Sequence, residues 1–152
     1  MLLNGNLSQG NVDFMGTIPH FLGIEFSWVF HPDGHLSVSL TQQSFAESFI
    51  DSLGIPSIGY STYSRPYQSG MSIDSLPHQN LSVPVQDQLR LQYQSIVGNL
   101  NWLAHTTHPD LSTVVSLLAQ HQCKPSPAHL ETALYVVHYL YATKTIGILF
   151  YE

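Results

Sequence analysis

Residues 88–105, which read QLRLQYQSIVGNLNWLAH, are the stretch that decides the fold. Placed on a helix at about 100° per residue, their apolar side chains gather on one side, at the spacing typical of a buried helical face. The residues of this predicted buried face are Leu89, Tyr93, Ile96, Val97, Leu100, Leu103 and Ala104. The pattern therefore predicts an amphipathic helix that packs into a core.

The opposite face of this helix has an unusual composition. Gln94, Gly98 and Trp102 recur at every fourth position, and Asn101 lies beside them. A glycine inside a helix costs about 0.5–1 kcal/mol relative to alanine, and an outward tryptophan leaves a large ring in water. Such a face would let a bulky ligand approach the backbone closely. The alternative is that Trp102 covers a neighbouring segment and that Gly98 is neutral, and the spacing alone favours neither.

Residues 93–103, YQSIVGNLNWL, resemble the thumb helix of copia-type retrotransposon reverse transcriptases. In the similar helix of the retroviral thumb, the face that carries the glutamine, glycine and tryptophan follows the minor groove of the template–primer duplex. The resemblance therefore implies that Gln94, Gly98, Asn101 and Trp102 bind nucleic acid. It also implies an RNA–DNA or DNA duplex as the partner, in the context of a complete polymerase.

Other segments follow the same family in the same order, over about residues 15–151. Residues 16–25, GTIPHFLGIE, resemble the segment that comes after the polymerase active site, which implies a primer-grip-like role for Phe21, Leu22 and Gly23. The remaining similar segments are residues 40–45, 107–111 and 127–143. Together they point to the C-terminal part of a reverse transcriptase domain, comprising the primer grip, the thumb and the connection.

The sequence also departs from this family. The Tyr-x-Asp-Asp motif that holds two metal ions is absent, and no two acidic residues are adjacent. The chain stops where the family's ribonuclease H domain would begin. Several positions that carry cations in the family hold other residues here, namely His108, Leu130, Tyr135, His138 and Tyr141. We therefore expect a fragment without catalytic residues, metal site or cofactor, since magnesium would belong to the complete enzyme, and no polymerase activity from this chain alone.

The pattern along the chain predicts an α+β fold. Residues 21–29 read as a strand, the Pro-Asp-Gly of residues 32–34 as a turn, and residues 35–40 as the second strand of a β-hairpin. Thr41 is a candidate N-cap for a following helix that ends at Gly54. The two phenylalanines of that helix, at 45 and 49, are far more often core residues than ligand contacts.

The second half of the chain is predicted to be helical. A long Pro-, Ser- and Gly-rich loop leads into a three-helix thumb-like bundle and a terminal strand at residues 146–151. Thr107 with Asp110, and Ser126 before Pro127, are candidate starts of the second and third helices, and the second is expected to stop before Pro125. The predicted domains are residues 1–54 (end of the palm with the primer-grip-like hairpin), 55–86 (flexible connection) and 87–152 (thumb and connection).

The charge of the chain argues against a free-standing nucleic-acid binder. Four Lys and Arg residues stand against ten Asp and Glu, for a formal net charge of −6, whereas affinity for nucleic acid rests on the neutralisation of phosphates. The half with the thumb-like helix is closer to neutral, with three basic and four acidic residues in 86–152. The alternative function is a decayed or domesticated transposon remnant that acts as a protein-interaction module.

Other chemistries receive little support. His105 with His108, and His121 with Cys123, are ligand types that zinc accepts, but the first pair straddles a turn and the second points to different sides of a helix end. No frame for a Ser–His–Asp hydrolase is present. A single cysteine favours an intracellular protein, no apolar run approaches the ~18–20 residues of a membrane span, and the resemblance implies a cytoplasmic virus-like particle.

Overall fold

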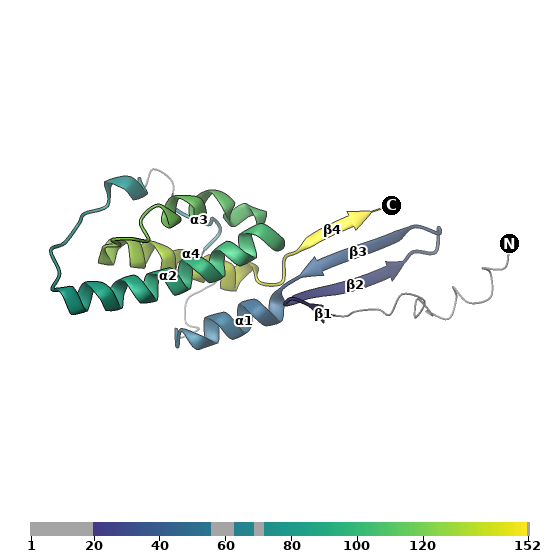
Figure 1. The fold of residues 1–152 in the computed structure, drawn as a ribbon. Helices are drawn as coiled ribbons and strands as arrows, with labels where there is room; N and C mark the ends of the chain where they lie inside the picture. Colours follow the sequence, from purple (N-terminus) through teal and green to yellow (C-terminus); the bar gives the residue numbers. More distant parts are fainter. Residues whose placement is uncertain (1–19, 56–62, 69–71, 152) are drawn as a thin grey trace.

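The structure is a computed structural model that describes residues 20–55, 63–68 and 72–151. In these residues an antiparallel four-stranded sheet joins four α-helices, which confirms the predicted α+β class (Figure 1). The elements, in chain order, are β1 (His20–Phe21), β2 (Ile24–Phe30), β3 (Leu36–Thr41), α1 (Gln43–Ser52), η4 (Ile73–Ser75), α2 (Val83–Thr106), η5 (Pro109–Leu111), α3 (Ser112–Ala119), α4 (Pro127–Thr143) and β4 (Ile148–Tyr151). The strands lie in the order β1-β2-β3-β4.

The predicted hairpin is confirmed, but its first strand is divided. β2 and β3 pair along their whole length around the predicted turn, where Gly34 has a φ of 90°. The single strand predicted over 21–29 is wrong, because the chain reverses at Leu22 and Gly23 and places Phe21 opposite Ile24. Both turn residues have positive φ, 53° and 78°, as a two-residue hairpin of the I′ type requires.

The start of α1 uses a cap that the local sequence does not contain. Thr41 is the last residue of β3 rather than an N-cap, and no side chain of the preceding residue, Gln42, caps the helix. Instead, the backbone N–H of Ser44 donates to Oε1 of Glu25 in β2, over 2.8 Å. Hydrogen bonds from the side chain and the backbone of Ser44 hold the pKa of the Glu25 carboxyl below its usual value. A carboxylate from the sheet therefore takes the place of the predicted threonine cap.

The terminal strand pairs with a strand from the first half of the chain. β4 pairs antiparallel with β3, so that Ile148 lies opposite Leu40 and Phe150 opposite Val38. Just before β4, a Cβ placed on Gly147 would lie 2.1 Å from the backbone oxygen of Leu40. Only a glycine lets the chain pass β3 at this distance, which fixes where β4 joins the sheet.

The helix that organises the sequence is confirmed and is longer than predicted. α2 begins at Val83 instead of 88, with Pro84 in its first turn, where the missing N–H is not needed. The buried residues of α2 are the seven predicted from the periodicity. The hydroxyl of Tyr93 also donates to the carbonyl of Leu118, over 2.7 Å, which joins α2 to α3 inside the core.

The two following helices start differently from each other. Thr107 is not an N-cap, because it ends α2 and its hydroxyl donates to Gln42. The short η5 then intervenes, and α3 ends at Ala119, before the predicted limit at Pro125. The start of α4 is confirmed, since Ser126 and His129 form a reciprocal capping box. The predicted Thr107 cap does not form, because the Thr107 hydroxyl donates to Gln42 instead.

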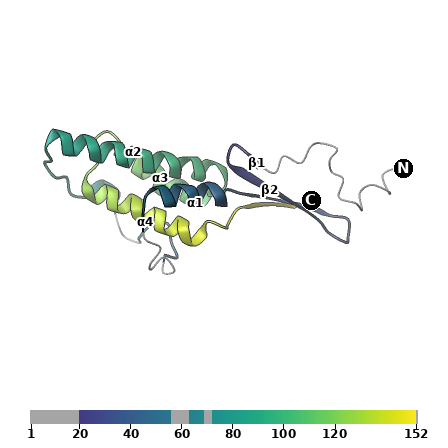
Figure 2. The ribbon, with the colours of Figure 1, turned by 90° about the horizontal axis from the view of Figure 1, so that it is seen from below.

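The helices share one core, and the sheet extends beyond them (Figures 1 and 2). α1 packs on α4, and its buried Phe49 and Ile50 belong to the same core as the buried face of α2. Ile73 of η4 is 2% exposed in this core as well. The described parts of residues 1–54 and 87–152 therefore pack together, and the division into three domains stays a prediction.

Candidate nucleic-acid interface

The outward face of α2 and the β1–β2 turn lie at the same end of the helical layer. In both views the turn lies beside the C-terminal end of α2, where the sheet leaves the helices (Figures 1 and 2). The residues singled out in sequence are thus carried by two neighbouring elements. We call the following exposed residues of these two elements the candidate face: Phe21, Leu22, Gly23, Leu91, Ser95, Gly98, Asn101 and Trp102.

Gly98 is the most informative residue of the candidate face. It lies in the middle of α2, and a Cβ added to it would meet nothing within 4 Å. Packing therefore does not explain the glycine, although it costs the helix about 0.5–1 kcal/mol relative to alanine. Ser95 and Leu91, the latter 64% exposed, continue the same line along the helix. Leu91, Ser95 and Gly98 thus form an exposed strip along α2 that has no side chain at Gly98.

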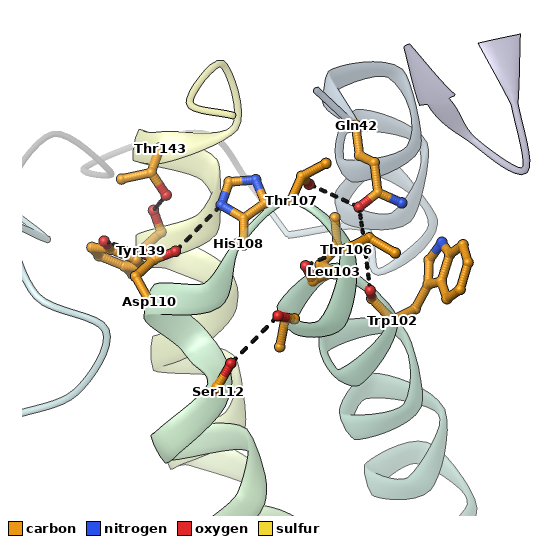
Figure 3. Close-up of polar contacts among 11 residues, drawn as sticks. Gln42, Trp102, Leu103, Thr106, Thr107, His108, Asp110, Ser112, Tyr139 and Thr143 are labelled. Atoms are coloured by element: carbon orange, nitrogen blue, oxygen red, sulfur yellow. Dashed lines mark hydrogen bonds and ion pairs between the residues drawn. The ribbon is translucent and has the colours of Figure 1, made fainter. Parts of the chain in front are cut away.

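Trp102 borders this strip on the side of the β1–β2 turn. Its side chain is among the exposed large hydrophobic groups, at 36%. Figure 3 shows its indole on the side of α2 away from His108 and Asp110. Asn101 is exposed beside it, and its backbone oxygen accepts from Nδ1 of His105 at 2.8 Å. Trp102 is therefore available to a ligand over about a third of the surface of the residue.

Gln94 has a structural role that the sequence did not reveal. It is half-buried, and its amide nitrogen donates to the backbone oxygen of Gln122 over 3.0 Å. This hydrogen bond holds the connection between α3 and α4 against α2. Of the four residues assigned to nucleic acid, Gly98, Asn101 and Trp102 are thus exposed, while Gln94 is engaged within the fold.

The β1–β2 turn is strained at an exposed apolar residue. Leu22 has a φ of 53° and is 66% exposed, in a conformation that asparagine or glycine adopts more easily. Gly23 follows with a positive φ, and a Cβ on it would lie 3.5 Å from the ring of Phe45. An exposed leucine in a strained conformation points to a use outside the fold.

A buried glutamine joins the end of α2 to the junction of β3 and α1. Gln42 is fully buried between β3 and α1, and its Oε1 accepts from the hydroxyls of Thr106 and Thr107 at the end of α2 (Figure 3). The hydroxyl of Thr106 also donates to the carbonyl of Trp102, over 2.7 Å. Sequence reasoning missed Gln42, because a glutamine at a strand–helix junction carries no periodic signal of burial.

The candidate face has no fixed charge on α2. Residues 91–106 contain no Lys, Arg, Asp or Glu. The nearest cation, Arg90, forms a 3.1 Å ion pair with Asp87 within the same helix. Contact with a duplex would therefore rest on shape, apolar area and hydrogen bonds rather than on the neutralisation of phosphates.

The described residues do not bring the candidate zinc ligands together. Among them, no group of three or more His, Cys, Asp or Glu side chains is placed to hold a metal ion. His105 is exposed on α2, His108 is buried at its end, and Cys123 is exposed near α3. No helix in this part of the chain is long and apolar enough to cross a membrane.

Two curated proteins are similar to parts of the chain. Over 54 residues, 36% of this chain and 18% of the relative, it is 48% identical to a transposon Ty5-1 protein of Saccharomyces cerevisiae. Over 58 residues, 38% of this chain and 41% of the relative, it is 38% identical to the secreted RxLR effector protein 161 of Plasmopara viticola. The matches thus span well under half the length of either relative.

The first similarity connects the chain with transposable elements. Comparison with known protein families gives no match. Comparison with solved structures gives none either.

Proposed function

We propose that this chain is a fragment of a retrotransposon RNA-directed DNA polymerase whose candidate face grips the template–primer duplex. The exposed Gly98, which nothing in the fold requires, is the observation that carries the proposal. An A-form duplex presents a wide and shallow minor groove, and a helix position without a side chain lets the helix backbone approach such a surface closely. The similarity to a transposon protein supports the same assignment.

The chain would act in this role as part of a larger enzyme. The missing fingers and palm would supply the acidic residues that hold magnesium, and a ribonuclease H domain would follow. Assembly in a cytoplasmic virus-like particle belongs to the same proposal. With a neutral face on α2 and an acidic chain, isolated binding should be no tighter than about 10⁻⁴ to 10⁻⁶ M at physiological salt.

Substitutions at Gly98 and Trp102 separate this role from a structural one. Gly98→Ala should raise the free energy of unfolding by about 0.5–1 kcal/mol, because alanine is the better helix former. The same change should weaken binding to an RNA–DNA hybrid, and Gly98→Leu should weaken it further. Trp102→Ala should cost up to about 1–3 kcal/mol of binding where the ring stacks, and less in a groove.

The measurement is a hybrid titration by fluorescence anisotropy beside a thermal melt of each variant. Gln92→Ala is the matched control, since Gln92 is exposed on α2 but lies off the candidate face. A higher free energy of unfolding together with weaker hybrid binding in Gly98→Ala would support the proposal. Loss of the melting transition in both the Gly98 and Trp102 variants would instead show that these residues serve the core.

A second candidate function, a protein-interaction module, is favoured by one face of the sheet. Alternation along the paired strands places eight apolar residues on this face, and both views show no described helix lying over it (Figures 1 and 2). They are Phe26, Trp28, Phe30, Leu36, Val38, Leu40, Ile148 and Phe150. Trp28, Phe30 and Phe150 are exposed, at 42%, 48% and 55%, and contiguous exposed apolar residues mark interaction sites.

The occupant we infer for this sheet face is a second copy of the chain. None of the eight residues is charged, and Glu25 of β2 lies on the opposite face, so two copies could pack without bringing like charges together. Sedimentation velocity should then show a dimer that Trp28→Ser with Phe150→Ser abolishes. A wild-type chain that stays monomeric at high concentration would reject this function.

A further inference from the structure

Three histidines meet where the chain leading into α2 crosses the ends of α3 and α4. His78 lies in this segment, His121 follows α3, and His129 is in the first turn of α4. The ring centroids of His121 and His78 lie 4.2 and 5.5 Å from that of His129. Three ionisable rings from three parts of the chain are therefore in contact or close to it.

The contacts of His129 favour its neutral form. It is fully buried, and its Nδ1 accepts a hydrogen bond from the backbone N–H of Ser126 at 3.1 Å. A proton on Nδ1 would remove this acceptor and with it one of the two reciprocal hydrogen bonds of the capping box of α4. The ring also lies at the helix N-terminus, where the backbone dipoles disfavour a cation. Burial, and then the nearby His121 and His78, lower the pKa of His129.

The other groups around His129 attach η4 to the helices. Nε2 of His121 lies 3.1 Å from Oδ1 of Asp74, which is the residue after the buried Ile73. The Asp74 carboxylate and the Ile73 carbonyl favour a proton on His129, but less strongly than burial opposes it. The ring of Tyr93, from α2, completes the surroundings at 6.4 Å. Among the described residues, Asp74 is thus the fixed charge that acts on His129.

We propose that His78, His121 and His129 form an acid-sensitive latch that holds residues 72–82 against the ends of α3 and α4. In neutral solution the contacts between the tilted rings, the Asp74 contact and the capping box hold this segment closed. When His129 takes up a proton, the acceptor at Nδ1 is lost and a positive charge must leave the buried site. The segment then opens, and because it continues directly into α2, the N-terminal turns of α2 are freed with it.

The direction of the pH dependence follows from linkage. The pKa of His129 is lower in the closed form than in an open, solvated form, for which the ordinary value is about 6.5. The closed form is therefore fully favoured above pH ~6.5 and loses this advantage as the pH falls below that value. Between pH 7.5 and 5.5, one such proton can raise the opening equilibrium by up to about tenfold.

Hydrogen exchange in residues 72–82, corrected for the intrinsic effect of pH, tests this latch. Protection in the wild type should fall by up to about tenfold between pH 7.5 and 5.5. His129→Gln should remove this dependence, because glutamine at the third helical position keeps the capping box but does not titrate. His105→Gln, on the exposed face of α2, is the matched control and should behave as the wild type.

Two outcomes would overturn the latch. One is unchanged protection of residues 72–82 in the wild type over this pH range. The other is an equal fall in the wild type and in His129→Gln, which would assign the effect to other groups. His121→Gln provides a second variant, since it can still donate to Asp74 but removes a ring that helps to lower the pKa of His129, and it should give a smaller fall than the wild type. Amides of residues 96–103, in the C-terminal half of α2, should keep their protection throughout, which distinguishes local opening from global unfolding.

Discussion

Replacing Gly147 by alanine should lower the free energy of unfolding by about 1–3 kcal/mol or more and detach β4 from the sheet. The new Cβ would lie 2.1 Å from the backbone oxygen of Leu40 and 2.7 Å from Cγ2 of Thr41. A side chain could rotate away from such a contact, but the carbonyl of Leu40 belongs to β3, which pairs with both β2 and β4. The strands must therefore separate to relieve the overlap.

Urea denaturation measures this loss, and hydrogen exchange of the β3 amides shows where it arises. Gly98→Ala is the matched control, because the added Cβ meets no atom within 4 Å and the substitution should raise the free energy of unfolding. Exchange should increase on the side of β3 that faces β4, while the pairing of β2 with β3 persists. Equal stability of the wild type and Gly147→Ala would contradict the close approach of the two strands.

Replacing His108 by leucine should raise the free energy of unfolding at neutral pH by about 1–3 kcal/mol. His108 is 1% exposed, and neither of its ring nitrogens has a hydrogen-bond partner among the described residues. The nearest carboxylate oxygen, on Asp110, lies 3.8 Å from Nδ1 and accepts no hydrogen bond from it. Leucine has a similar volume and removes the buried polar atoms, while Tyr139 can keep its 2.6 Å hydrogen bond to Asp110 (Figure 3).

The same substitution should also change the response to acid. Burial lowers the pKa of His108, although Asp110 acts in the opposite direction. The folded state is therefore favoured above pH ~6.5 and loses stability as the pH falls, by up to about 1.4 kcal/mol per pH unit for this one group. Urea denaturation at pH 7.5 and 5.5 should show a smaller difference for His108→Leu than for the wild type. A variant that is less stable at both pH values would show that His108 makes contacts that leucine cannot replace.

The sequence predicted the elements whose pattern is local and periodic. The buried face of α2 was predicted residue by residue, because its apolar side chains recur at the helical period. The hairpin turn at Gly34 and the start of α4 at Ser126 were also predicted, since a turn and a capping serine act within a few residues. These features depend little on the rest of the chain.

The errors arose where a distant partner decided the outcome. Thr41 and Thr107 do not cap helices, because Glu25 reaches α1 from β2 and Gln42 takes the hydroxyl of Thr107. The division of the first strand at Leu22 required positive φ at a leucine, which no propensity indicates. In the candidate face, periodicity placed Gly98 and Trp102 outward, but the bond from Gln94 to the α3–α4 connection could not be predicted from spacing.

We propose that, among the surfaces of the described residues, the candidate face contacts a template–primer duplex. Amide chemical shifts of the ¹⁵N-labelled chain during titration with an RNA–DNA hybrid test this contact most directly, since weak binding is well suited to this method. We expect shift changes at Leu91, Ser95, Gly98 and Trp102 and at the turn of residues 21–23, with none along the eight apolar residues of the sheet face. Changes centred on that sheet face, or no change at millimolar hybrid, would contradict it.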